Sequence, residues 1–309
     1  MCAERFEEEA RKTGKPFRIV YLTNVGGSYN MLGETLRLTR EVLLEVSDFR
    51  RENCPLSALT LGVKCGTSDA TSGIAGNPCV GAAFDQLIRA GGTAFFSETT
   101  EIIGAEDLVA KRAVNESVAK KILSAAKHWE DKAKATGEDI RKINPIPANI
   151  AAGISSLEEK SLGAIAKSGT SPIQDVLKYA EMPKGSGLYF VDSWMSSLSL
   201  PLCLTACGAT IMLYQMGGGK IAQHPMMPSI NPTVVSPFLY LTGNAIAYSR
   251  APDNFDFDAS PIMTEGASIP EMGTKLLEHL SAIASGTMTK METLNYAEQL
   301  ELYMEGPVL

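Results

Sequence analysis

Short apolar runs alternate with longer amphipathic stretches along most of the chain. Five runs rich in β-branched and aromatic residues are typical of strands, at residues 17–23, 59–65, 93–98, 187–193 and 210–215. Apolar positions at helical spacing predict helices at residues 31–50, 80–90, 105–142, 155–169, 172–181, 270–284 and 291–303, and in a stretch that ends near Cys207. This alternation predicts an α/β fold, Rossmann-like, with a mostly parallel sheet flanked by helices.

Two segments interrupt the alternation. The stretch "NPIPAN" at residues 144–149 contains two prolines, which indicate a domain boundary or a hinge. Residues 221–268 are rich in proline and are predicted to be loop-rich.

The overall composition excludes several functional classes. The 309 residues carry a formal net charge of −7 without a basic stripe, so nucleic-acid binding is not expected. No apolar run reaches the roughly 18 residues of a membrane span, and the acidic N-terminus is unlike a signal peptide. We therefore expect a cytoplasmic protein that does not bind membranes, with six cysteines present as reduced thiols.

Polar clusters follow four of the predicted strands directly. They read "KCGTSDATSGIAGNP" (64–78), "SETTEIIGAE" (97–106), "DSWMSS" (192–197) and "QMGGGK" (215–220). In open parallel sheets, ligands bind beyond the carboxyl ends of the strands, because loops and helix N-termini meet there. The four clusters are therefore expected to gather around one site.

Carboxylates are the first candidates for chemistry in these clusters. They are Asp69, Glu98, Glu101, Glu106 and Asp192, and oxygen ligands of this kind suit divalent metal ions. The alternative is structural, because three of them open a predicted helix, where negative charge is stabilised by the helix dipole. Asp69 and Asp192 stay open between the two interpretations.

Other candidate residues also have two interpretations. Cys65 is either a metal ligand or nucleophile, or a buried thiol, and His224 is a candidate ligand or acid/base group. Lys160 is by default a charged surface lysine, with catalysis as the alternative. Glycines 217–219 leave room for an anion at the backbone, but they match neither a Walker motif nor a dinucleotide fingerprint.

Long stretches of the sequence resemble the altronate/galactarate dehydratase family, which includes the large subunit of sulfolactate sulfo-lyase. They are "GVKCGTSDATSGIAGNPCVGAAFDQLIRAGGTAFFSETTEIIGAEDLVAKRA", "NPIPANIAAGISSLEEKSLGAIAKSGTSPIQDVLKYAE", "GLYFVDSWM" and "ASGTMTKMETLNYAE". The resemblance covers most of residues 17–309.

Two loops depart from the family pattern. Sugar-acid dehydratases of the family carry Asp-Thr-Pro-Gly-Tyr-Asp-Pro where this chain has "DSWMSSLSL", and Thr-Thr-Gly-Arg-Gly where it has "QMGGGK". Gly218 thus replaces an arginine, the natural bidentate clamp for a carboxylate, which puts a sugar-acid substrate in doubt. Lys220 is a candidate for the missing charge, and both variants look more like the sulfo-lyase branch.

The resemblance also implies a domain organisation. Full-length family members carry a small N-terminal β-rich domain and a further α/β segment before the region that this chain resembles. Residues 1–58 are expected to match the end of that middle segment, and residues 59–309 the C-terminal α/β domain.

The activity implied by the resemblance is a metal-dependent lyase that acts on a 2-hydroxy or sugar acid. Fe²⁺ or Mn²⁺ would hold the acid while a base removes a carbon-bound proton and the β substituent leaves. We expect metal ligands at Asp69, Glu98, Asp192 and Cys65. Catalytic groups are expected at Asp69, Glu98, Glu101 and Lys160, and substrate contacts at Ser68, Ser72, Asn77, Gly217, Gly218, Gly219 and Lys220.

A non-catalytic role is the rival hypothesis. The chain would then be an incomplete subunit that needs a separate, small partner resembling the family's N-terminal domain. An oxidoreductase has no support, because no nucleotide fingerprint is present. A homodimer is expected, since the apolar helix faces suit either a core or a partner.

Overall fold

The computed structural model describes residues 2–218, 231–233, 235–294 and 301–302. The chain divides into two compact units, Met1–Asn53 and Cys54–Leu309. The assignment of residues 1–58 to the end of a family middle segment stays a prediction.

The first unit contains two helices, α1 (Cys2–Thr13) and α2 (Ser28–Ser47). Helix α2 confirms the helix predicted at residues 31–50. The strand predicted at 17–23 is wrong, because these residues form turns and irregular backbone. A strand needs a partner for its backbone N–H and C=O groups, and the described residues of this unit include no second strand to provide one.

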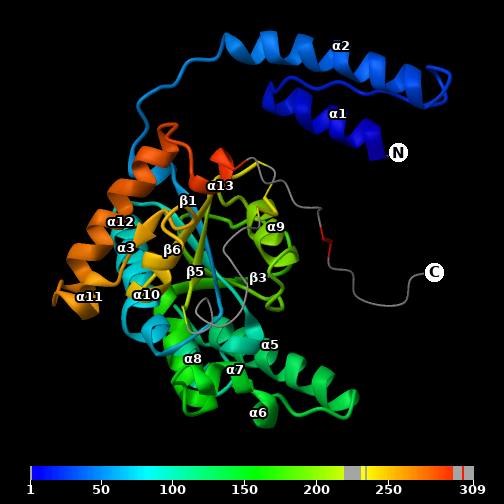
Figure 1. The fold of residues 1–309 in the computed structure, drawn as a ribbon. Coiled ribbons are helices and arrows are strands. Elements are labelled where there is room, and N and C mark those ends of the chain that lie inside the picture. The colour runs from blue at the N-terminus through cyan, green and yellow to red at the C-terminus, as the bar shows by residue number, and fades with distance from the viewer. Residues whose placement is uncertain (1, 219–230, 234, 295–300, 303–309) are drawn as a thin grey trace. The chain divides into compact units, whose positions relative to one another are not determined.

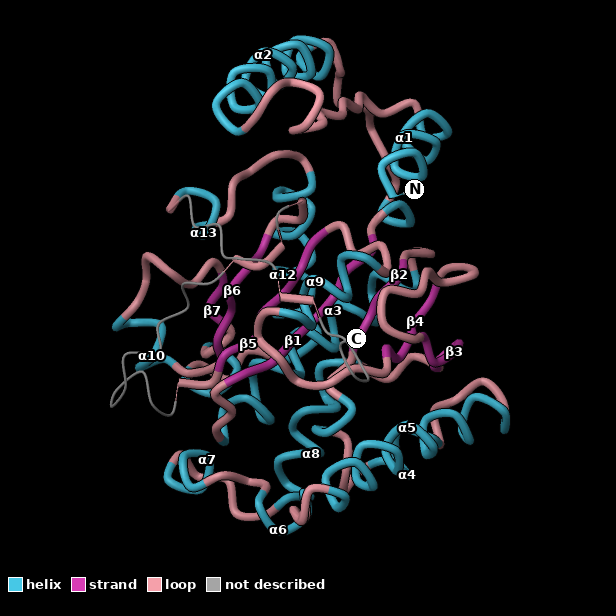
Figure 2. Tube along the Cα trace, turned by 90° about the vertical axis from the view of Figure 1, so that its right-hand side faces the viewer, coloured by secondary structure: helices cyan, strands magenta, loops and turns pink. Residues whose placement is uncertain are grey.

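The second unit is built on a seven-stranded sheet in which every pairing is parallel. Its spatial order is β3 (Ile173–Leu177), β4 (Gly187–Val191), β2 (Thr93–Phe96), β1 (Thr60–Gly66), β5 (Ile211–Met216), β6 (Phe238–Thr242) and β7 (Phe257–Asp258). Figure 2 shows the strands side by side in the middle of this unit, with β3 near one edge. The predicted α/β class with a parallel sheet is confirmed.

Helices cover both faces of the sheet, as parallel strands require. One face packs against α3 (Asn77–Arg89), α5 (Glu116–Ala135) and α12 (Ile269–Ala284), and the other against α9 (Ser199–Ala206), α10 (Ala245–Arg250) and α13 (Lys290–Thr293). Figure 1 shows α3 and α12 on one side and α9 on the other. Each face of the sheet has its own hydrophobic core, and side chains along a strand point to the two faces in turn. In β4, Phe190 lies in the core under α3 and Tyr189 in the core under α9.

Shorter helices complete this unit. They are α4 (Glu106–Ala110), α6 (Ile140–Ile143), α7 (Pro147–Ala151), α8 (Leu157–Ile165), α11 (Pro261–Thr264), the 3-10 turns η1 (Leu56–Ala58), η3 (Thr99–Glu101) and η4 (Ala166–Ser168), and the π-helical turn η2 (Ser72–Gly76).

Three predicted elements differ from the structure. Residues 172–181 contain strand β3 instead of a helix, and residues 221–268, predicted to be loop-rich, contain β6, α10, β7 and α11. The helix predicted at 291–303 is described only as α13, and residues 295–300 and 303 lie outside the described residues.

The strand order places a topological switch point between β1 and β5. On one side lie β1, β2, β4 and β3, which the chain forms before it crosses over, and on the other side lie β5, β6 and β7, which it forms in that order. Loops at the carboxyl ends of two such strands diverge and leave a crevice where ligands bind in open α/β sheets. The polar loop after β1 and the glycines after β5 meet here, because Thr67 donates its hydroxyl to the Gly217 carbonyl at 3.1 Å.

A search of the described helices finds none that is both long and apolar enough to cross a lipid bilayer.

Candidate active site

Four side chains near the carboxyl ends of β1 and β2 form an almost fully buried cluster. Lys64 is 4% exposed, Cys65 3%, and Glu98 and Lys167 1% each. Oε2 of Glu98 pairs with Nζ of Lys167, and Oε1 of Glu98 lies 3.6 Å from Nζ of Lys64. Cys65 donates its backbone N–H to Glu98 at 3.0 Å, and Lys167 donates to the Cys65 sulfur at 3.1 Å. We call these four residues the lysine–glutamate cluster.

The two lysines reach Glu98 from opposite faces of the sheet. Lys64 and Cys65 are consecutive on β1, so their side chains point to different faces. Lys64 lies over the ring of Tyr214, 4.8 Å from its centroid, on the face covered by α9. Lys167 comes from η4, which packs against α3 on the other face. The carboxylate of Glu98 is therefore enclosed between two cations.

The backbone at Glu98 is in an unusual conformation. Its φ of 72° and ψ of 64° place it in the left-handed region, which residues other than glycine rarely adopt. Thr67, after the neighbouring strand, also has a positive φ, of 45°. Such backbone strain persists only where the surroundings impose it, and it concentrates at functional sites.

The charges of this cluster sum to +1. Burial alone would raise the pKa of Glu98, but Lys167 and Lys64 hold it below its ordinary value, so Glu98 is ionised. Burial would lower the pKa values of both lysines, yet the neighbouring negative and polar groups, Glu98 among them, raise them. Burial and the charge of Glu98 raise the pKa of Cys65 to about 11, so Cys65 is a neutral thiol at pH 7. Two ammonium groups thus face one carboxylate.

Asp69 connects the loops that follow three strands. Its Oδ1 accepts hydrogen bonds from the Thr71 hydroxyl at 2.7 Å and from the Ser72 N–H at 3.0 Å. Its Oδ2 accepts from the Gly218 N–H, after β5, at 2.8 Å and from the Asn244 amide, after β6, at 2.9 Å. Both carboxylate oxygens are therefore engaged in holding the loops together.

A second buried ion pair joins α8 to η3. Lys160, 8% exposed, lies 3.1 Å from a carboxylate oxygen of Glu101, which is 5% exposed. Lys160 also donates to the side-chain oxygen of Asn144 at 2.6 Å. The default interpretation of Lys160 as a surface lysine is therefore wrong.

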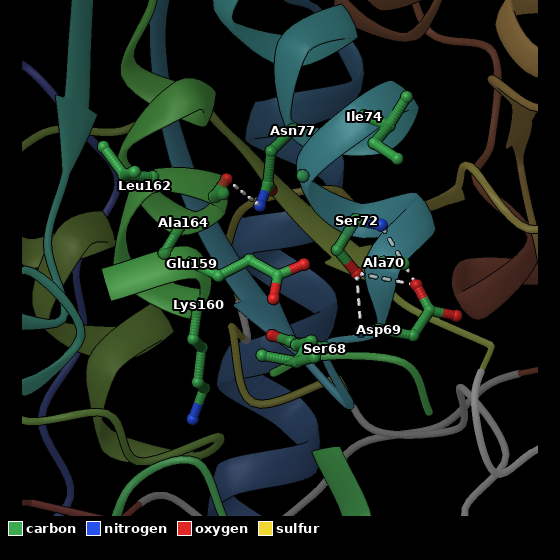
Figure 3. A pocket seen from close by; sticks show the side chains of 13 residues that line it. Ser68, Asp69, Ala70, Ser72, Ile74, Asn77, Glu159, Lys160, Leu162 and Ala164 are labelled. Carbon is green, nitrogen blue, oxygen red and sulfur yellow. Dashed lines mark hydrogen bonds between the residues drawn. The ribbon is translucent and has the colours of Figure 1, made fainter. Parts of the chain in front are cut away.

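A cavity of about 240 Å³ lies between the loop after β1 and α8. Its polar lining residues are Ser68, Asp69, Ser72, Asn77, Glu159 and Lys160, and Figure 3 shows Asn77 and Glu159 directed into the space between the two segments. Asn77, 1% exposed, donates to the Gly163 carbonyl at 2.8 Å, while its Oδ1 has no partner among the described residues. Three of the seven predicted substrate contacts, Ser68, Ser72 and Asn77, thus line one cavity.

Of the four predicted metal ligands, Cys65 and Glu98 lie together in the lysine–glutamate cluster, whereas Asp69 and Asp192 are engaged elsewhere. Asp192, after β4, accepts hydrogen bonds from the Thr99 hydroxyl at 2.7 Å and from the Trp129 indole at 2.9 Å. It shares neither partner with Asp69 or Glu98. Within the described ranges, no group of three His, Cys, Asp or Glu residues is placed to hold a metal ion. Two lysine ammonium groups beside Glu98 also oppose a divalent cation there. The described residues thus do not fit the ion, and we derive no chemical step through it.

The remaining candidates have different outcomes. Gly217 and Gly218 are buried in the loop after β5, whereas Gly219, Lys220 and His224 lie outside the described residues. Glu106 is bonded to the Gly104 N–H and pairs with Arg141, so its contacts favour the structural interpretation.

Sequence reasoning missed Lys64 and Lys167. Lys64 could have been noticed, because it lies inside an apolar strand. Both faces of a parallel sheet are covered by helices, so a lysine in such a strand must be buried. Lys167, in the short stretch after α8, has no comparable signal in the sequence.

The chain is similar to enzymes that act on small hydroxy acids. It is 33% identical over 292 residues to the (2R)-sulfolactate sulfo-lyase subunit beta of Chromohalobacter salexigens, covering 93% of this chain and 72% of that protein. It is 34% identical over 283 residues to the galactarate dehydratase (L-threo-forming) of Escherichia coli, covering 91% and 52%. The altronate dehydratase of Bacillus subtilis is 33% identical over 272 residues, covering 88% and 52%.

These relatives differ from the chain in length. The chain spans about half the length of the two dehydratases, at 52% of each. Residues 56–307 match the model of the C-terminal region of D-galactarate/altronate dehydratases. The matched residues include the sheet, the lysine–glutamate cluster and the cavity. The chain therefore belongs to the D-galactarate/altronate dehydratase family.

Proposed function

We propose that this chain is a lyase that eliminates water, or sulfite, from a small hydroxy acid. The names of its relatives support this reaction class. The observation that carries the proposal is the net charge of +1 in the buried lysine–glutamate cluster. The loop that follows Cys65 also lines the cavity with polar walls. A buried unbalanced charge is costly, and the carboxylate of an acid substrate would balance it.

The three charged groups of the cluster each have a role in the elimination. The ammonium group of Lys64 holds the substrate carboxylate and stabilises the negative charge that develops when the adjacent carbon loses its proton. Glu98 accepts that proton, the electron pair of the C–H bond forms a C=C bond, and the bond from the β carbon to its hydroxyl or sulfonate group breaks. Lys167, which is hydrogen-bonded to the carboxylate of Glu98, donates a proton to a departing hydroxyl, which leaves as water.

Turnover by the purified chain tests this function. The substrates are galactarate, altronate and (2R)-sulfolactate, and the products are a 2-oxo acid after dehydration or sulfite after desulfonation. We expect turnover of at least one acid and a loss of about 10²–10⁴-fold in kcat for Lys167→Met. A folded wild-type chain that neither binds nor converts any of them would refute the proposal.

Dependence on Fe²⁺ or Mn²⁺ stays a prediction from the family resemblance. Chelation followed by re-addition of either ion tests it. Activity that falls on chelation and returns with Fe²⁺ or Mn²⁺ supports the prediction, and unchanged activity in a chain shown by elemental analysis to be metal-free contradicts it.

The second candidate function is a subunit that is active only with a partner. One observation favours it, namely that the chain covers about half of each related dehydratase. The test adds the unmatched N-terminal half of the Escherichia coli galactarate dehydratase to the assay. Turnover only in the mixture supports this candidate, and equal turnover by the chain alone refutes it.

A further inference from the structure

Gln215, near the carboxyl end of β5, carries a buried amide without hydrogen-bond partners. The residue is 0% exposed, and neither its Nε2 nor its Oε1 has a partner among the described residues. In the described part of the chain, the other buried side chains that lack a partner do so at one atom only. An unpaired buried donor or acceptor is costly and therefore rare in folded proteins. A ligand that brings both an acceptor and a donor would supply the two missing bonds.

The register of the sheet places this amide next to the lysine–glutamate cluster. Cys65 on β1 and Gln215 on β5 are direct partners in the parallel pairing. Paired residues on neighbouring strands, about 4.8 Å apart, point to the same face of the sheet. The two side chains therefore lie side by side on the face that carries Lys167, whose ammonium group donates to Cys65 at 3.1 Å.

The π-helical turn η2 covers the amide. A Cβ at Gly76 would lie 2.3 Å from Nε2 of Gln215, so the amide packs directly against this residue. Ser72 and Gly73 of the same turn line the cavity beside α8. An acid that extends from the cluster toward the cavity would therefore pass beside the Gln215 amide.

A hydroxyl group matches the amide better than a charged group does. It accepts a hydrogen bond from Nε2 and donates one to Oε1, whereas a carboxylate or a sulfonate would pair only with Nε2. In the proposed elimination, Lys64 holds the substrate carboxylate and Lys167 serves the leaving group. The hydroxyl at C2, on the carbon that loses its proton, has no partner in that arrangement.

From these observations we propose that Gln215 is a specificity-determining residue whose amide binds the C2 hydroxyl of the substrate. The same contact fits galactarate, altronate and (2R)-sulfolactate, because all three carry a hydroxyl at C2. This inference rests on the proposed lyase function, because that function assigns the carboxylate and the leaving group of the acid to the lysine–glutamate cluster.

Binding of matched acids to the full chain tests the proposal. The pairs are (2R)-sulfolactate with 3-sulfopropanoate, and altronate with its 2-deoxy derivative, and the members of each pair differ only by the hydroxyl at C2. By calorimetric titration we expect the wild type to bind the hydroxy acid about tenfold or more tightly than its partner. Gln215→Met keeps the size of the side chain but removes both polar atoms. It should reduce this ratio to about one by weakening binding of the hydroxy acid alone.

The melting temperature of the ligand-free chain gives a second readout. Gln215→Met removes two unpaired buried atoms, so it should raise the melting temperature by about 2 °C or more while it weakens binding. A side chain with only a structural role would not move stability and affinity in opposite directions.

Gln86→Met is the matched control, because the amide of Gln86 on α3 has partners. It donates to the Pro270 carbonyl at 3.1 Å and accepts from the Thr274 hydroxyl at 3.1 Å. The same substitution here should lower the melting temperature and leave the binding ratio unchanged.

The outcomes separate this role from the lyase function. A wild type without preference for the hydroxy acid, or a Gln215→Met ratio equal to that of the wild type, overturns the role of Gln215 while the lyase function stands. A Gln215→Met chain that melts below the wild type also overturns it, since the amide then has partners in the ligand-free chain. If the ratios change as expected but no acid is converted, the lyase function fails and the hydroxyl contact stands. If neither pair binds, both proposals fall.

Discussion

Glu98 is the residue on which the charge balance of the candidate active site depends. Replacing it with glutamine would leave two buried ammonium groups without their carboxylate. Removing one partner of a buried ion pair costs about 3–5 kcal/mol, so we expect Glu98→Gln to lower the free energy of unfolding by that amount and to abolish turnover. Urea denaturation and a steady-state assay measure the two effects.

A double variant separates stability from chemistry at this residue. Glu98→Gln combined with Lys167→Met removes one charge of each sign, so it should recover much of the unfolding free energy while turnover stays absent. A double variant that is as unstable as Glu98→Gln would contradict the proposed charge balance.

The cluster also makes a prediction about pH. The folded-state pKa of Glu98 lies below its ordinary value of 4.5, so its contribution to stability is complete above about pH 4.5 and is lost as the pH falls through the folded-state pKa. We therefore expect the unfolding free energy of the wild type to decrease relative to the double variant as the pH falls below about 4.5. Denaturation curves of the two proteins across this range measure it, and parallel pH profiles would count against an ionised, buried Glu98.

Asp69 was a candidate from the sequence, but its hydrogen-bond partners could not be predicted. Its hydrogen bonds to Gly218 and Asn244 span 149 and 175 positions of the chain. Asp69→Asn keeps the shape but replaces one acceptor oxygen with a donor, and we expect a loss of about 1–3 kcal/mol in unfolding free energy.

A double-mutant cycle with Asn244→Ala checks this prediction about Asp69. The hydrogen bond between the two side chains should appear as a coupling energy of about 0.5–3 kcal/mol. Additive effects of the two substitutions would show that the loops are held together by other contacts.

At the level of elements, two glycines bring η2 and α8 into backbone contact. A Cβ at Gly73 would lie 2.9 Å from the Cα of Gly163, which is closer than real Cβ atoms approach. Gly73→Ala should therefore push α8 from the cavity, lower the unfolding free energy by about 1–3 kcal/mol and weaken binding of the acid. Thermal unfolding and titration with altronate measure the two effects.

Gly33→Ala is the control for the glycine pair. Gly33 lies in α2 with an ordinary φ, and a Cβ added there would meet no atom within 4 Å. Alanine should stabilise this helix by roughly 0.5–1 kcal/mol. If Gly73→Ala were equally stabilising, the close contact between η2 and α8 would not be a constraint.

Strand β3 shows why some elements could not be predicted from the pattern. Ile173 and Leu177 are the buried ends of this strand, with three half-buried residues between them. A spacing of four positions fits one face of a helix and equally one face of a strand, so periodicity cannot distinguish the two. Strands β1, β2, β4 and β5 were predictable, because their apolar runs are continuous and buried on both faces.

At the level of the whole molecule, the sequence predicted which loops meet better than which side chains pair within them. The carboxyl edge of a parallel sheet follows from the order of strands and polar loops, and the family match includes all the residues involved. The pairing of Glu98 with Lys167 joins segments 69 positions apart, so only the folded chain shows it. Light scattering of the purified chain checks the expected homodimer, with twice the mass of 33.1 kDa as the predicted result.

A crystal structure of the chain with altronate tests the central claim most directly. We expect the carboxylate of the acid within hydrogen-bond distance of the ammonium group of Lys64, and the rest of the acid in the cavity beside α8. An acid bound elsewhere, with the lysine–glutamate cluster unchanged and the cavity without ligand, would contradict the account.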